Sequence, residues 1–581
     1  MKKLIFCSLI ILTFNYSYSN ILYVKYNSVG ANNGANWLNA FTSLQSALNA
    51  ATSGDQIWVA SGIYTPSYSY DFENTTRFYH FRMKSGVAIY GGFAGNESSN
   101  FNLSNRNFVT NQTILSGDIG IIGDNSDNCY HVFFNPSELG LTNTAILDGF
   151  TITNGNANGP EPHTYGAGIY NNNSNSKFTN CIITNNIALF GGGMFNFVSN
   201  PFISNCTFSN NSAGNIDPNA SAGGLWNELS SSTITDCSFK NNYTSRNGGG
   251  IVNYKSSSSI INCTFINNNA IANGGGIYNN SSTTSIINCS FSSNSTTGYG
   301  GGICNDDFSL SNIINCSIAY NSANAGGGAI YQDGVTNLEN SILWANDGGL
   351  GKQIYIYKVK PYGILNIYYS CFSNGTNDVS GTITVLNSIT SNPNFVNVST
   401  NDLRIFGNSP CINSGFNSYN STNYDIRGQN RIQNSIIDMG AYEFTSGIDP
   451  VSSLFPIITT EAIININMNS AFCGGYAISD GGSQVTSRGV CWNTTGNPTI
   501  TDSKTIDGTG LGSFSSTMTG LNPSTNYFVR AYATNSQGTS YGTQLSFLTL
   551  DPVPEMPVWA LITVGILFVG FGGWFAIKRN I

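Results

Sequence analysis

Residues 260–303 read IINCTFINNNAIANGGGIYNNSSTTSIINCSFSSNSTTGYGGGI and hold two copies of one pattern. Each copy has an apolar residue, an Asn-Cys pair, a second apolar residue, another Asn and a glycine run, in that order. Almost the same pattern surrounds six cysteines separated by 25, 31, 26, 26 and 27 residues: Cys181, Cys206, Cys237, Cys263, Cys289 and Cys316. A period of about 20–50 residues is typical of solenoid proteins, in which each repeat is one structural unit.

The residue types within one period predict short strands joined by corners. Cys263 and Phe265 share one face of a strand, whereas Ile260 is out of phase with them. Asn262 therefore marks a bend, because asparagine tolerates the left-handed conformation, and Asn268 is expected to begin a second corner. Stacked coils of this kind predict an all-β, right-handed parallel β-helix. Its coils have about 26 residues, roughly ten to thirteen in number, and the most regular ones span 166–331.

The glycine runs and the cysteines both favour tight stacking of the coils. Glycines are expected where no Cβ fits or where φ must be positive. Equivalent positions in stacked strands lie about 4.8 Å apart, which is wide for the Cβ separation of a disulfide. The cysteine ladder is therefore predicted to consist of buried free thiols, and no histidine joins it to indicate a metal site. Residues 216–221 are an insertion that is expected to loop out.

Looser coils are predicted before the regular repeat, at residues 55–60, 87–92 and 144–150. A short helix is predicted upstream of them from apolar residues that share one face: Phe41, Leu44, Leu48 and Ala51. Thr42 and Gln45 match the spacing of a capping box at the start of this helix. We expect the helix to cover the open N-terminal end of the β-helix, where apolar interior and strand edge both need protection.

Composition places bounds on the fold and on the partners. The chain has 581 residues, which predicts several domains or one elongated body. Only 9% of residues are charged, whereas 40% are hydrophobic, so the chain has enough apolar surface to fold. The net charge is -8 and the sequence contains no basic patch. We therefore expect no nucleic-acid partner, and no motif indicates a cofactor.

The N-terminal segment 1–19 is typical of a signal peptide. Lys2 and Lys3 precede an apolar run that ends at Phe14, and Ser17 and Ser19 are the small residues before a cleavage site after Ser19. The alternative interpretation is a buried N-terminal strand. A signal peptide predicts that the rest of the chain is exported.

The C-terminal segment predicts a membrane anchor. Residues 558–577 form an apolar run long enough to span a bilayer, and Lys578 and Arg579 follow at once. The alternative is a core helix of a soluble domain. With both end segments interpreted in this way, the residues between them face the periplasm or the outside, so the protein is expected in the cell envelope or at the cell surface.

Two sets of motifs resemble known β-helix surface proteins. Residues 36–37 and 62–66 are similar to the N-terminal cap and first coil of β-helix proteins with the pectin-lyase-like fold. Motifs between 340 and 443 resemble the choice-of-anchor Q domain: Asn340-Ser341-Ile342-Leu343-Trp344, Asn392-Pro393-Asn394-Phe395, Asn408-Ser409-Pro410-Cys411-Ile412-Asn413-Ser414-Gly415, Asp425-Ile426-Arg427-Gly428, Arg431 and Asp438-Met439-Gly440-Ala441-Tyr442-Glu443.

This resemblance implies a surface protein of the bacterial envelope and implies no particular reaction. The capped β-helix would occupy 20–339 and the anchor-type C-terminal coils 340–445. A buried ion-pair network that closes the final coils is expected from four charged residues: Asp425, Arg427, Asp438 and Glu443.

A separate domain is predicted after a linker at 446–455. Residues 521–527 and the strand 528–533 resemble the tyrosine corner of a fibronectin type III sandwich, here spanning 456–549. The stretch 487–492 is similar to the variant found in Bacteroidota surface proteins. Cys473 and Cys491 are candidates for a disulfide within this domain, with free thiols as the alternative. Such domains are usually spacers or binding units.

The tail 551–581 resembles the tripartite sorting signals of the PEP-CTERM and IPTL type. In those signals a proline motif precedes a membrane helix and basic residues, and a sorting transpeptidase cuts near the motif. The matching residues are Pro554, Pro557, Trp559, Lys578 and Arg579. This chain has Pro554-Glu555-Met556-Pro557 where the motif has Pro-Glu-Pro.

Two functional hypotheses remain open on the sequence. The first is a non-enzymatic adhesin or glycan-binding stalk that contacts carbohydrate or a neighbouring cell, with Tyr278 and Tyr331 either stacking on sugars or packing internally. The second is a polysaccharide lyase or glycoside hydrolase. Asp306 and Asp307 are the only adjacent acidic pair in the repeat and the only weak catalytic candidates, and they can act together only on a turn. The sparse charges favour the first hypothesis.

Overall fold

The computed structural model describes residues 20–552 apart from 71–74, 215–220, 358–362, 374–378, 381–382, 447–454, 482–483 and 537. The chain divides into two units, and the boundary in the sequence falls between Asp449 and Pro450. The predicted signal peptide, most of the insertion at 216–221 and the tail from 553 onward lie outside the described residues. Within the described part of the chain, no helix has the length and apolarity needed to cross a bilayer.

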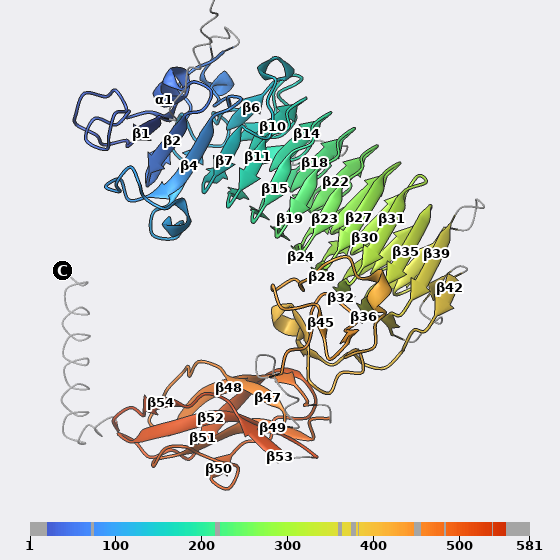
Figure 1. Ribbon diagram of the computed structural model, residues 1–581. Coiled ribbons are helices and arrows are strands. Elements are labelled where there is room, and N and C mark those ends of the chain that lie inside the picture. The colour runs from blue at the N-terminus through green and yellow to red at the C-terminus, as the bar shows by residue number, and fades with distance from the viewer. Residues whose placement is uncertain are drawn as a thin grey trace, which may run out of the picture. The chain divides into compact units, whose positions relative to one another are not determined.

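The first unit is a parallel β-helix whose strands align from coil to coil (Figure 1). Sheet A joins β1 (Ile21–Val24), β2 (Gln56–Ala60), β4 (Ala88–Phe93), β7 (Ile146–Asp148), β11 (Lys177–Thr179), β15 (Phe202–Ser204), β19 (Thr233–Thr235), β23 (Ser259–Ile261), β27 (Thr283–Ile287), β31 (Leu310–Ile314), β35 (Val335–Glu339), β39 (Ile364–Tyr368) and β42 (Ile383–Leu386). Sheet B joins β3 (Gly62–Tyr64), β5 (Thr113–Ser116), β8 (Thr151–Thr153), β12 (Ile182–Thr184), β16 (Thr207–Ser209), β20 (Ser238–Lys240), β24 (Thr264–Ile266), β28 (Ser290–Ser292), β32 (Ser317–Ala319), β36 (Ile342–Trp344) and β40 (Cys371–Phe372).

Two further parallel sheets complete each coil. Sheet C joins β6 (Phe133–Asn135), β10 (Ile169–Asn172), β14 (Met194–Phe197), β18 (Leu225–Glu228), β22 (Ile251–Tyr254), β26 (Ile277–Asn280), β30 (Ile303–Asp306), β34 (Ile330–Gln332), β38 (Ile354–Ile356) and β41 (Val379–Ser380). Sheet D joins β9 (Asn156–Ala157), β13 (Ile187–Ala188), β17 (Ser212–Ala213), β21 (Tyr243–Thr244), β25 (Asn269–Ala270), β29 (Ser295–Thr296), β33 (Ser322–Gly326) and β37 (Asp347–Leu350). The predicted parallel β-helix is confirmed.

The corner before each cysteine is the predicted one. The residue at this position has a φ of 52–55° in all six copies: Asn180, Asn205, Asp236, Asn262, Asn288 and Asn315. The second corner differs from the prediction, because the left-handed residue stands one position earlier, for example Asn267 at φ 54°. Asn268 lies inside the coil instead, where its side chain belongs to a buried ladder with Asn242 and Asn294.

The cysteine rungs are buried free thiols, as predicted. The Cys263 backbone N–H donates to Cys289 Sγ at 3.4 Å, and the Cys263 thiol donates to the carbonyl of Ile261. The glycines also behave as expected. Gly274 has a φ of +67°, and a Cβ on Gly275 would lie 2.5 Å from the carbonyl oxygen of Gly301.

The N-terminal end is covered by helix α1 (Leu44–Ala50), whose Leu44 and Leu48 are buried against the first coils. The capping box predicted from Thr42 and Gln45 is wrong, because Ser43 is the N-cap and its hydroxyl accepts from the Ser46 N–H at 3.2 Å. Short 3-10 helices lie in the early coils: η1 (Thr76–Phe78), η2 (Leu103–Asn105) and η3 (Ser137–Leu139).

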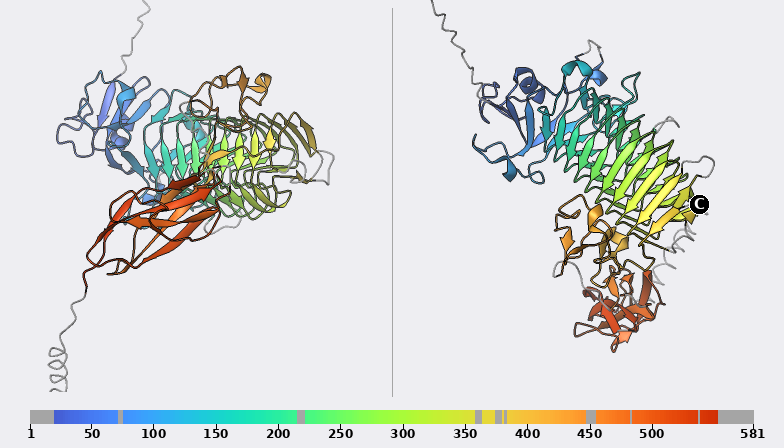
Figure 2. Two further views of the ribbon diagram at one scale, coloured as in Figure 1. Left: turned by 90° about the horizontal axis from the view of Figure 1, so that it is seen from below. Right: turned by 45° about the vertical axis from the view of Figure 1, so that its right-hand side comes forward.

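Residues 387–446, here called the lateral lobe, fold back onto the coils (Figure 2). The lobe contains two hairpins and two 3-10 helices: β43 (Phe395–Asn397) with β44 (Asp402–Ile405), β45 (Ile432–Gln433) with β46 (Ile436–Ile437), η5 (Val398–Thr400) and η6 (Asn417–Tyr419). Asn288 Nδ2 donates to the carbonyl of Tyr424, and the Ala441 N–H donates to Ser317 Oγ. The lobe therefore covers the outer surface of sheet B near its end.

The charged network predicted in the lobe is present. Asp425, Asp438 and Glu443 are buried, and Arg427 Nη2 lies 3.1 Å from Asp425 Oδ2. Arg431, which was not predicted to take part, is fully buried at the centre and lies 3.8 Å from Glu443.

The second unit consists of two antiparallel sheets with their own apolar core. One sheet joins β47 (Ile457–Thr460), β48 (Ser470–Ser479) and β51 (Gly512–Thr519). The other joins β50 (Ser503–Lys504), β49 (Ser487–Asn493), β52 (Asn526–Asn535), β53 (Gly538–Tyr541) and β54 (Leu545–Leu548). Tyr527 Oη accepts from the Asn522 N–H at 3.0 Å, which is the predicted tyrosine corner of a fibronectin type III-like sandwich. Cys473 packs in the core of this unit, whereas Cys491 stands between the core residues Val490 and Trp492 and points to the other face of its strand, so the candidate disulfide between them is wrong.

Candidate functional site

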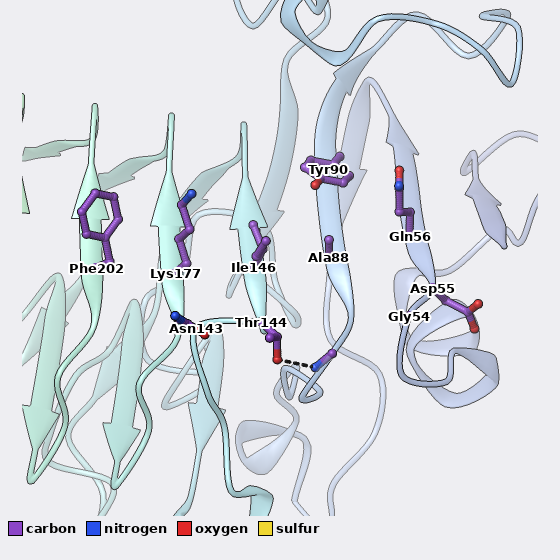
Figure 3. Close-up of a pocket in the computed structure, with 11 residues that line it drawn as sticks. Gly54, Asp55, Gln56, Ala88, Tyr90, Asn143, Thr144, Ile146, Lys177 and Phe202 are labelled. Carbon is purple, nitrogen blue, oxygen red and sulfur yellow. Dashed lines mark hydrogen bonds between the residues drawn. The ribbon is translucent and has the colours of Figure 1, made fainter. Parts of the chain in front are cut away.

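The outer face of sheet A carries a hollow of about 600 Å³ across five neighbouring strands, β2, β4, β7, β11 and β15 (Figure 3). Strand register places one residue of each strand in a single row: Gln56, Ala88, Ile146, Lys177 and Phe202. The residues that follow them in sequence point into the core, so this row points outward. The hollow forms because Ala88 and Ile146 are shorter than the groups around them.

The rim of the hollow is partly aromatic and partly polar. Tyr90 stands two residues after Ala88 on the same face, and Phe202 closes the far side with 37% of its surface exposed. Asn143 and Thr144 come from the loop before β7, and Thr144 Oγ1 accepts from the Gly86 N–H at 3.0 Å. The hollow is thus an open surface depression with rings at two edges and amide or hydroxyl groups at a third.

The charged groups of the hollow have different environments. The Asp55 carboxylate accepts from the N–H and hydroxyl of Thr52 and from the Asn20 N–H. Burial raises the pKa of Asp55, but these hydrogen bonds outweigh it and hold the pKa below its usual value. Lys177 Nζ lies 5.5 Å from the centre of the Phe202 ring. Lys177 belongs to the lining of the hollow, and among the described residues no carboxylate forms a salt bridge with it.

Tyr90 lies beside an ion pair. Arg106 Nη2 is 2.9 Å from Asp148 Oδ1, and the guanidinium lies 5.0 Å from the centre of the Tyr90 ring. Burial and the Asp148 carboxylate raise the pKa of Tyr90, while Arg106 opposes the shift. Tyr90 is therefore a neutral phenol at physiological pH that can stack and form hydrogen bonds.

This arrangement suits binding better than acid–base cleavage. A glycoside hydrolase needs two carboxyl groups at a working separation. Asp55 is the single carboxylate that lines the hollow in the described part of the chain, and its oxygens already accept hydrogen bonds. Aromatic rings combined with a few polar groups are the usual lining of a small-molecule or sugar subsite.

The acidic pair named from the sequence lies elsewhere, at the end of β30 on sheet C. Asp306 Oδ2 accepts from the Tyr278 hydroxyl and Asp307 Oδ2 from the Ser281 hydroxyl, each at 2.8 Å. Asp307 has a φ of 46°, so the pair stands on a turn, which was the condition for joint action. Their catalytic role stays a prediction.

Tyr278 and Tyr331 are 8% and 7% exposed, and they pack beside Cys304 on the outer face of sheet C. Of the two roles open to them, internal packing therefore fits the structure and sugar stacking does not. The sorting residues Pro554, Pro557, Trp559, Lys578 and Arg579 lie outside the described residues. Within those residues no group of three or more His, Cys, Asp or Glu side chains is placed to hold a metal ion.

Sequence reasoning missed the hollow for a physical reason. Three of its five row residues, Gln56, Ala88 and Ile146, come from coils that lack the cysteine marker, and a long excursion of the chain separates Ala88 from Ile146. Only the strand register shows that they are neighbours. The outward phase of Lys177 and Phe202, each next to a predicted core residue, was the one signal available.

Comparison with known proteins gives a match to the middle of the β-helix. Residues 288–306 match the repeat of the Chlamydia polymorphic membrane proteins. This segment begins at the Asn288 corner and ends at Asp306, so it covers most of one coil. No curated protein sequence matches the chain.

Solved structures align with a part of the chain equal in size to one small domain. The sensor domain of the anti-sigma factor RsgI4 from Pseudobacteroides cellulosolvens is 18% identical over 17% of this chain and 96% of its own, with a TM-score of 0.14. A fibronectin type III domain of human KIAA0970 is 16% identical over 18% of this chain and 82% of its own, with a TM-score of 0.15. The sixth such domain of human fibronectin type III domain containing protein 3 is 19% identical over 18% and 88%, with a TM-score of 0.14.

Proposed function

We propose that this protein is a non-enzymatic surface protein that binds an extracellular glycan in the hollow on sheet A. The main support for the proposal is the strand register, which makes Lys177 and the exposed ring of Phe202 neighbours. Both side chains line the same hollow as Tyr90. Aromatic rings stack on the apolar faces of sugar rings, and the amide and hydroxyl groups of the rim suit sugar hydroxyls. The β-helix serves as the rigid support.

The proposed location is the bacterial cell surface. The apolar segments at both ends, the resemblance to the choice-of-anchor Q domain and the match to a membrane-protein repeat support it. The fibronectin type III-like unit would act as a spacer between the β-helix and a membrane helix at 558–577. A sorting transpeptidase would act near Pro554 and Pro557.

The location is tested on the protein made in its own cells. Mass spectrometry of the envelope form should find a new N-terminus at Asn20 and no peptide that contains Lys578. A full-length C-terminus in that form argues against processing, and an intact N-terminus argues against export.

Glycan binding is tested with Phe202→Ala. Loss of the exposed ring should weaken binding on an array of neutral and acidic polysaccharides by about tenfold, since one stacked ring contributes on the order of 1 kcal/mol or more. Tyr243→Ala is a matched control, because Tyr243 is 38% exposed but lies on sheet D. Equal affinities of the wild type and Phe202→Ala for every glycan would show that the hollow is not the binding site.

The alternative function is a polysaccharide lyase or glycoside hydrolase. Prolonged incubation with pectin, alginate and neutral glycans should release no oligosaccharide. Release that disappears in the Asp306→Ala, Asp307→Ala double variant would establish the enzymatic alternative and place its site on sheet C.

A further inference from the structure

The lateral lobe meets the last coil at two cysteines. Cys371 in β40 is the register partner of Ile342, while the next residue, Phe372, pairs with Leu343 and points into the core. Cys371 therefore points outward from sheet B, toward the lobe. Cys411 comes from the lobe, and both cysteines belong to one buried cluster with Ile342, Ile405 and Met439.

The two thiols are enclosed by the same small buried cluster. The Cys371 thiol donates to the carbonyl of Ser391 at 3.2 Å. Neither side chain is accessible to solvent. Forty residues separate the two cysteines in sequence, so they are not rungs on neighbouring strands of one sheet.

This pair differs from the cysteine ladder inside the coils. Ladder cysteines are fixed by the spacing of adjacent strands, about 4.8 Å, and that spacing exceeds the Cβ separation of a disulfide. The ladder position is continued in the last coils by serines, since Cys316 N–H donates to Ser341 Oγ and Ser341 N–H donates to Ser370 Oγ. Cys371 thus lies one residue beyond the ladder, and its distance to Cys411 is set by the docking of the lobe.

We propose that Cys371 and Cys411 form a disulfide in the exported protein, which fastens the lateral lobe to the last coil. The inference rests on the export part of the proposed function, because disulfides persist in oxidising compartments. The oxidant is a protein or low-molecular-weight disulfide. One cysteine thiolate attacks it and releases a thiol, and the second cysteine attacks the mixed disulfide and releases the other thiol. Both cysteines lose a proton and the oxidant gains two electrons.

The bond is expected to form before the lobe has docked. The neighbouring Cys371 thiol and burial raise the pKa of the Cys411 thiol, so little of the reactive thiolate exists in the docked state. Oxidised glutathione added to the folded, reduced protein should therefore react slowly, whereas refolding in its presence should give the disulfide.

The test uses the full chain refolded with oxidised and reduced glutathione. Free thiols are alkylated, the protein is digested with trypsin without reduction, and the peptides are identified by mass spectrometry. The expected product joins residues 359–404 to residues 405–427, each of which contains a single cysteine. Alkylated Cys371 and alkylated Cys411 on separate peptides would overturn the proposal. That result would say nothing about glycan binding or export, because the refolding experiment measures neither property.

Limited proteolysis provides a second measurement. Dithiothreitol, or the Cys411→Ser substitution, should speed cleavage within the lobe by about 30-fold or more, since one disulfide restrains opening by that factor. Cys491→Ser in the second unit is the matched control and should leave cleavage of the lobe unchanged. Equal cleavage rates with and without dithiothreitol would also count against the disulfide.

Discussion

Asn268 lies wholly inside the β-helix and uses every hydrogen-bonding group of its side chain. Its Nδ2 donates to the carbonyl of Phe239 and to Asn294 Oδ1, each at 2.9 Å. Its Oδ1 accepts from the N–H and the Nδ2 of Asn242. A fully satisfied amide of this kind fixes the vertical register of three coils at once, because a slip of one residue would leave all of these groups unpaired.

We therefore expect Asn268→Ala to be strongly destabilising. The change leaves the buried N–H of Asn242 and the carbonyl of Phe239 without their hydrogen-bond partners. These two unpaired groups together lower the free energy of unfolding by about 2–4 kcal/mol. Urea unfolding of the first unit, followed by circular dichroism, should show the loss as a lower midpoint. Asn267→Gly is the control, because Asn267 is exposed at φ 54° and glycine adopts that conformation without strain. A shift no larger than that of the control would contradict the role of the ladder.

At the scale of elements, the regular coils could be predicted, whereas the buried charged network was the part of the lateral lobe that the sequence predicted. The regular coils are encoded by residues that lie close together in sequence, such as Cys263, Phe265 and the glycines. The spacing of these residues therefore predicts the strands, the corners and the stacking of the coils. The lobe and the hollow depend on pairs far apart in sequence, such as Asn340 with Gly440, which no periodicity encodes. The corner predicted at Asn268 lies at Asn267 for the same reason. The Asn268 side chain points inward because it bonds to Asn242 and Asn294 of the neighbouring coils.

The stability of the lateral lobe depends on pH through the buried carboxyl group of Glu443. Burial and the neighbouring Asp438 carboxylate raise the pKa of Glu443 to about 8, and Arg431 opposes this shift. The folded state thus binds a proton at Glu443 more tightly than the unfolded state, in which the pKa is near 4.5. The stabilisation is complete below about pH 4.5 and is lost as the pH rises through about 8.

We expect Glu443→Gln to remove this dependence, because the amide imitates the protonated carboxyl. Scanning calorimetry between pH 4.5 and 8.5 should show the unfolding midpoint of the wild type falling with pH more steeply than that of the variant, in a range bounded by the two pKa values. Glu138→Gln is the control, since the Glu138 side chain is 64% exposed and should keep the wild-type slope. If the unfolding midpoint of Glu443→Gln falls with pH as steeply as that of the wild type, a group other than Glu443 causes the pH dependence.

At the scale of the whole molecule, the chain has two independent cores. The core of the first unit runs from Val24 to Phe372, and the core of the second runs from Ile458 to Phe547. A repeat body gains stability coil by coil, whereas a small sandwich unfolds as one cooperative domain. The two units should therefore show separate unfolding transitions in one chain.

Tyr527→Phe tests this separation, because it removes only the hydroxyl that accepts from the Asn522 N–H. The loss should cost the second unit about 1 kcal/mol and lower its transition by several degrees, since a domain of this size shifts by about 4–8 °C per kcal/mol. The transition of the β-helix should not move, because its core shares no residue with the sandwich. Calorimetry of the full chain resolves the two transitions. A shift of both together would mean that the units unfold as one cooperative body.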